Sequence, residues 1–143
     1  TAERSEAVAK PDKAEREVTP ELPKAMGSLV QKLNDAARDL VEALDGALPK
    51  DLERNYAKGE RDVYSRRLFE TRSKNFEKML SGRYGSDRLV RGKIDAYSRL
   101  FERLLDTVSE SPKGERLVEA CLASESGRIY VMLAEAAGKL PPQ

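Results

Sequence analysis

The sequence contains, at residues 86–109, the stretch SDRLVRGKIDAYSRLFERLLDTVS, which is the most strongly patterned part of its 143 residues. Apolar side chains recur there at alternating steps of four and three, and three further leucines widen the stripe: Val90, Ile94, Tyr97, Phe101, Leu104 and Val108, with Leu89, Leu100 and Leu105. This spacing predicts an amphipathic helix over 87–109, with Ser86 or Asp87 as its N-cap. Because one helix cannot bury its own apolar face, other helices must pack beside it.

A second stretch has the same periodicity. From Pro20 onward, apolar residues again follow steps of four and three, and further apolar residues flank them: Met26, Val30, Leu33, Ala37, Leu40 and Leu44, with Leu29, Ala36, Val41 and Leu48. Proline favours a helix start, and the glycine and proline at 46–49 end a helix. The pattern therefore predicts a helix over 20–47.

The remaining helices are less regular. We expect a helical region over 51–80 that is kinked or broken near Gly59. We also expect helices over 112–123 and 126–138; residues 124–127 either separate them or form a weak point within one longer helix. Residues 81–85, SGRYG, predict a break before the 87–109 helix. The predicted fold is all-α, an antiparallel bundle of four to five helices spanning residues 19–143. Residues 1–18 hold little apolar surface and predict a mobile tail.

The amino-acid composition narrows the fold class, the kinds of partner and the cellular location that we expect for this protein. Charged residues make up 36% of the chain and hydrophobic residues 39%, tryptophan is absent, and this balance favours helices. The net charge of +1 argues against a globally basic nucleic-acid binder. No apolar run reaches the roughly 20 residues of a membrane-spanning helix, so no membrane partner is expected. The single cysteine, Cys121, cannot form an internal disulfide, and we expect a cytoplasmic location.

The sequence has no histidine. This excludes histidine phosphotransfer, nucleophiles activated by an imidazole base, and helical di-iron sites that need histidine ligands. No cluster of residues has metal-ligand spacing, and no nucleophile lies beside a base. We therefore expect no enzyme activity, no catalytic residues, no metal and no cofactor.

Charge and aromatic residues concentrate in residues 50–93. This segment carries 13 basic against 7 acidic residues, and it holds five of the eight aromatic residues: Tyr56, Tyr64, Phe69, Phe76 and Tyr84. Basic groups interleaved with aromatic rings are typical of proteins that bind single-stranded nucleic acid. The alternative is that Phe69 and Phe76, at helical spacing, belong to the core, and that the acids between the cations interrupt any positive stripe.

One local feature predicts an anion contact. The residues from Gly82 to Gly85 precede the 87–109 helix, and a helix N-terminus attracts phosphate or carboxylate groups. The candidate contacts for an anion or a nucleic acid are Arg83, Arg88, Arg91 and Lys93. The alternative is an ordinary turn between helices whose arginines face solvent.

By elimination, the sequence favours a non-enzymatic interaction module, such as an adaptor, a chaperone-like protein or an assembly domain. It has more helical apolar surface than any visible site needs. The expected partner is another protein or a second copy of this chain, and nucleic-acid binding through residues 50–93 is the alternative.

Overall fold

The computed structural model describes residues 21–139, in which every regular element is an α-helix. The all-α prediction is confirmed for this part of the chain, and the predicted tail at 1–18 lies outside it. The helices are α2 (Glu21–Asp45), α3 (Lys50–Ala57), α4 (Val63–Glu70), α5 (Lys74–Ser86), α6 (Arg88–Ser109), α7 (Gly114–Ala123) and α8 (Glu125–Ala136). These are seven helices among residues 21–139, so the predicted count of four to five is not confirmed.

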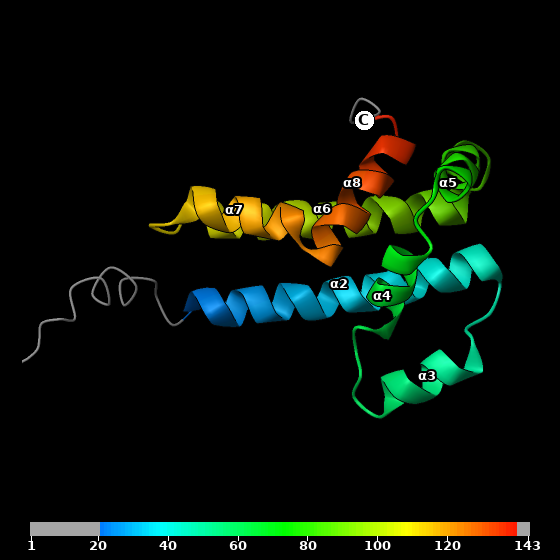
Figure 1. The fold of residues 1–143 in the computed structure, drawn as a ribbon, viewed down its shortest axis with the longest axis horizontal. Helices are drawn as coiled ribbons and strands as arrows, with labels where there is room; N and C mark the ends of the chain where they lie inside the picture. The colour runs from blue at the N-terminus through cyan, green and yellow to red at the C-terminus, as the bar shows by residue number, and fades with distance from the viewer. Residues whose placement is uncertain (1–20, 140–143) are drawn as a thin grey trace, which may run out of the picture.

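The two long helices form the frame of the fold. Figure 1 shows α2 and α6 running in opposite directions, and their contact is the most extensive between any two helices described. Helix α6 begins where the sequence predicts, because the Asp87 carboxylate accepts hydrogen bonds from the backbone N–H groups of Leu89 and Val90 at 3.1 and 3.2 Å. The shorter helices α4, α5 and α8 pack on this pair and on one another.

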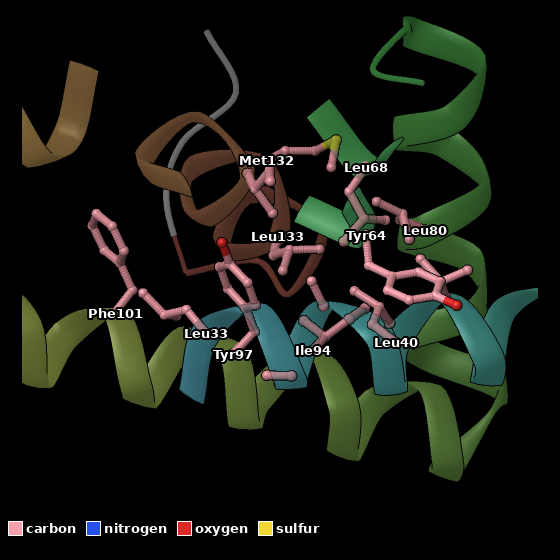
Figure 2. Close-up of a cluster of buried hydrophobic side chains, with 14 of the residues drawn as sticks. Leu33, Leu40, Tyr64, Leu68, Leu80, Ile94, Tyr97, Phe101, Met132 and Leu133 are labelled. Carbon is pink, nitrogen blue, oxygen red and sulfur yellow. The ribbon is translucent and has the colours of Figure 1, made fainter. Parts of the chain in front are cut away.

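The core lies where the short helices meet the α2–α6 pair. Figure 2 shows the side chains that converge there, and ten of them are labelled: Leu33 and Leu40 from α2; Tyr64 and Leu68 from α4; Leu80 from α5; Ile94, Tyr97 and Phe101 from α6; and Met132 and Leu133 from α8. None of these ten side chains is more than 3% exposed, so nearly all of the apolar area of each is buried and contributes to hydrophobic stabilisation of the fold. The stripe of α6 is thus the central surface on which the other helices assemble.

The predicted apolar stripe of α2 is confirmed at Leu33, Ala37 and Leu40, and it is wrong at Val30. Val30 is 42% exposed, whereas Leu29 is 6% exposed and Leu33 is fully buried. The buried residues of α2 are Leu29, Leu33, Asn34, Ala36, Ala37, Leu40 and Val41. Neighbouring positions on a helix differ by about 100°, and contact with α6 selects the face centred on Leu33 and Ala37. Leu89, predicted to widen the stripe of α6, is 59% exposed.

The middle of the chain forms three helices where a kinked helix or two pieces were predicted. Gly59, with φ of 112°, follows α3, and Ser73 begins α5 by accepting a hydrogen bond from the Phe76 N–H at 3.1 Å. The turn between α4 and α5 was missed in the sequence because it contains neither glycine nor proline.

The predicted break at 81–85 is wrong, because α5 continues to Ser86. Both Gly82 and Gly85 lie within the helix, where the Ser86 hydroxyl donates to the Gly82 carbonyl at 3.0 Å. A glycine in a helix costs about 1 kcal/mol relative to alanine. The burial of Leu80 and the packing of Tyr84 against the core offset that cost.

The C-terminal region forms two helices. Ser124 ends α7 and is also the N-cap of α8, since its hydroxyl accepts a hydrogen bond from the Gly127 N–H at 3.1 Å. The weak spot at 124–127 is therefore a true boundary, and it lets α8 turn away from α7 to reach the core (Figure 1).

Candidate functional site

Two of the four predicted anion contacts form bonds within the protein. Arg83 donates to the Asp87 carboxylate at 3.0 Å and to the backbone carbonyls of Ala43 and Leu44 at 3.2 and 3.4 Å. Arg91 donates to the carbonyls of Tyr84 and Gly85 at 2.9 and 3.3 Å. These guanidinium groups join the end of α5 to α2 and α6.

The N-terminus of α6 already holds a carboxylate. The backbone N–H of Val90 and the Arg83 guanidinium hold the pKa of Asp87 below its usual range. The remaining candidates, Arg88 and Lys93, form no side-chain hydrogen bond or ion pair with any residue between 21 and 139, and Arg88 is exposed. The structure thus brings Arg83 and Arg91 to one helix junction, with Asp87 between α5 and α6.

The aromatic residues of the basic segment face the protein interior or their neighbours. Tyr64 is fully buried, and the other four are partly buried against the core. The Tyr84 hydroxyl donates to Asp95 at 2.8 Å, and this bond raises the pKa of Tyr84. The Arg72 guanidinium lies 4.1 Å from the Phe69 ring centroid. All five rings are at least partly buried against the core, which leaves less ring surface free to stack on nucleic-acid bases.

A groove that the sequence did not predict lies between the start of α5, α7 and α8. Its cavity volume is about 740 Å³. Its apolar lining consists of Leu122 and Ala123 from α7 and Val131 and Met132 from α8. Met132 is 3% exposed and also touches the core beside Leu68 (Figure 2), so the floor of the groove is the edge of the core.

Six charged side chains surround this floor: Arg72, Lys74, Glu77, Glu119, Arg128 and Glu135. Three are cations and three are carboxylates, yet no ion pair joins any of them to another residue within 21–139. Arg72 donates only to the Phe69 carbonyl, at 2.9 Å. The Oε2 atom of Glu135 is buried and has no hydrogen-bond partner in the part of the chain described. A buried oxygen without a hydrogen-bond partner carries a free-energy cost.

The groove residues follow helical spacing on each wall. On α8, Arg128, Val131, Met132 and Glu135 are at i, i+3, i+4 and i+7, and on α7, Glu119, Leu122 and Ala123 are at i, i+3 and i+4. Both α7 and α8 therefore present apolar residues beside charged residues on the face that lines the groove. This pattern is visible in the sequence, but there it resembles an ordinary core stripe. Only the packing of α8 on α4 and α5 leaves part of it uncovered.

Other kinds of site have less support. Residues 21–139 contain no group of three or more cysteine, aspartate, glutamate or histidine side chains placed to hold a metal ion. Cys121 is half-buried, and burial raises the pKa of its thiol, which disfavours the reactive thiolate. Among the helices described, none has the length and apolar character to cross a bilayer.

Comparisons with known proteins identify no relative. No protein-family model matches the chain, and neither the curated proteins nor the solved structures contain a match. The groove and its chemistry therefore carry the functional argument.

Proposed function

We propose that the protein is a non-enzymatic interaction module that binds a helical segment of a partner protein in the groove between α5, α7 and α8. The observation that carries this proposal is an apolar floor edged by six charged side chains that have no ion-pair partner among residues 21–139. An amphipathic helix presents an apolar stripe of similar kind, with charges of both signs beside it. Cations from such a helix would face Glu119 and Glu135, and its carboxylates would face Arg72 and Arg128.

The charge pattern favours a polypeptide over a nucleic acid as the ligand. Three carboxylates line the groove and would repel a phosphate backbone, whereas a helix with mixed charges meets both signs. A second copy of this chain is the other protein occupant that we consider. The sequence favours an adaptor or assembly role in the cytoplasm, and we include that role in the proposal.

The test compares Val131→Asp with Val30→Asp. Val131 lines the groove, whereas Val30 is a surface valine of α2 with 42% exposure. Each protein is immobilised and used to select binders from a library of displayed helical peptides, and a selected peptide is then titrated by calorimetry. We expect Val131→Asp to weaken binding by about tenfold or more, because it places a charge on the apolar floor. Val30→Asp should bind as the wild type does.

Light scattering of the purified protein separates the two protein occupants. A concentration-dependent dimer that Val131→Asp dissociates identifies a second copy as the occupant. A monomer that selects no helical peptide, or equal weakening by both variants, would contradict the proposal.

Nucleic-acid binding through residues 50–93 stays the alternative. Lys78 and Arg88, on α5 and α6, are exposed and form no ion pair with the residues described. Lys78→Glu with Arg88→Glu is a better test than changes at Arg83 and Arg91, whose bonds support the fold. A gel-shift titration should show binding that falls steeply with salt and is lost in the double variant. Binding that is absent, or independent of salt, removes this alternative.

A further inference from the structure

Helix α3 is attached to the rest of the protein without a buried side chain. None of its eight residues is buried, and its closest neighbour is the short helix α4. Figure 1 shows α3 on the opposite side of α2 from α7 and α8, whose residues line the groove described above. Its apolar contribution comes from Leu52 and Tyr56, which are only partly buried against the core. Hydrophobic burial therefore holds α3 less firmly than the other helices.

Polar contacts centred on Glu53 connect α3 to α2 and α4. The Arg38 guanidinium donates to both oxygens of the Glu53 carboxylate, at 3.1 and 2.9 Å. The Tyr64 hydroxyl donates to the same carboxylate at 2.9 Å. A two-pronged arginine–carboxylate pair is directional and charge-assisted, so it fixes the orientation of α3. The pair is partly open to water, with side-chain exposures of 29% for Arg38 and 41% for Glu53.

Tyr56 makes the second set of contacts. Its hydroxyl donates to the Asp35 carboxylate on α2. The guanidinium groups of Arg38 and Arg61 lie 5.3 and 4.5 Å from its ring centroid. Its ring meets that of Tyr64 edge to face, with centroids 5.6 Å apart. Tyr56 thus covers a tyrosine that has no exposed surface in this arrangement.

Two glycines with positive φ lie in the segments that connect α3 to its neighbours: Gly46 directly after α2, and Gly59 two residues after α3 ends. Gly46 has φ of 80° and Gly59 has φ of 112°, values that residues with a Cβ rarely adopt. A Cβ at either position would meet open space, so the backbone conformation is the constraint there. Glycine also rotates readily between conformations, so these two positions allow the segment between them to change its orientation.

We propose that α3 is a hinged flap that detaches from α2 and α4 while the α2–α6 frame stays folded. Opening breaks the contacts of Glu53 and Tyr56 and uncovers Tyr64. An eight-residue helix is not stable alone in water, so the detached segment loses its helical hydrogen bonds. The open and closed states differ in whether the aromatic face formed by Tyr56 and Tyr64 is accessible, which makes the flap a conformational switch independent of the groove.

Hydrogen exchange followed by mass spectrometry tests this proposal on the intact chain. At neutral pH, backbone amides of α3 should exchange faster than those of α2 and α6, because local opening needs less free energy than global unfolding. Glu53→Gln should accelerate exchange in α3 by about tenfold, since it removes the charge from the pair with Arg38. Exchange in α6 should stay within about twofold of the wild type.

Glu60→Gln is the matched control. It makes the same chemical change at an exposed position outside α3, where the side chain forms no bond with the residues described. It should leave exchange in α3 unchanged. Arg38→Gln should also accelerate exchange in α3, and the double variant should accelerate it by less than the two single effects combined, because both changes remove the Arg38–Glu53 pair. Equal protection of α3 and α6 in the wild type would overturn the proposal. Acceleration of every helix by Glu53→Gln, or of none, would also overturn it.

Discussion

At the scale of single residues, two glycines in helices have opposite environments. A Cβ on Gly127 would collide with the backbone carbonyls of Cys121 and Leu122, because the chain turns back on itself between α7 and α8. A Cβ on Gly92, in α6, would meet nothing within 4 Å. The same substitution should therefore have opposite effects at the two positions.

Gly127→Ala should lower the free energy of unfolding by about 1–3 kcal/mol, as overpacking does when backbone must move. Gly92→Ala should raise it by about 0.5–1 kcal/mol, because alanine is the better helix former. Urea unfolding followed by circular dichroism measures both values. A neutral Gly127→Ala would mean that α7 and α8 do not approach as closely as described.

A second prediction at the residue scale is that Glu53 makes the stability of the fold depend on pH. Its hydrogen bonds from Arg38 and then Tyr64 hold the pKa of Glu53 below its ordinary value of 4.5. Because the folded state favours the ionised form, this stabilisation is present above the ordinary pKa and is lost as the pH falls through the lower folded value. A carboxyl-carbon NMR titration should show the low pKa in the wild type and a value near ordinary in Arg38→Gln. An unchanged pKa in that variant would show that Arg38 is not the cause.

At the scale of elements, α5 shows how packing overrides local sequence. The stretch from Ser81 to Gly85 predicts a break, because two glycines disfavour a helix. The structure continues the helix to Ser86, and Arg83 and Tyr84 on that last turn reach α2 and α6. Contacts distant in sequence therefore stabilise a turn that the local sequence alone would leave irregular.

Replacing both glycines tests this element. Gly82→Ala with Gly85→Ala should raise the free energy of unfolding by about 1–2 kcal/mol, since both positions are helical, exposed and open to a Cβ. In a flexible loop the same changes would alter stability little or reduce it. Thermal unfolding with circular dichroism distinguishes the two outcomes, and loss of stability would contradict a continuous α5.

At the scale of the whole molecule, a single core joins five of the helices described: α2, α4, α5, α6 and α8. Helices α3 and α7 contribute no large buried side chain to it. Ile94 lies in the first half of α6 with no exposed surface, among residues from α2, α4 and α8 (Figure 2). A defect there should affect all these helices together, in contrast to a defect in the α3 contacts.

Ile94→Ala should lower the free energy of unfolding by about 2–5 kcal/mol, through lost burial and the cavity that remains. Leu89→Ala, on the same helix at 59% exposure, should change it by no more than about 0.5 kcal/mol. Urea unfolding measures the difference. Similar values for the two variants would show that the face of α6 that carries Ile94 is not the buried one.

The sequence by itself determined the helical class and the two long helices, because their periodicity repeats over many turns and the Asp87 cap is a local signal. Only the tertiary structure decided that Val30 lies outside the buried face of α2, that the middle region divides into three helices, and which groups Arg83 and Arg91 bond. These features depend on contacts between segments far apart in the chain. The groove belongs to the second group, since its residues become a site only because α8 packs on α4 and α5 and leaves one side of Val131 and Leu122 uncovered.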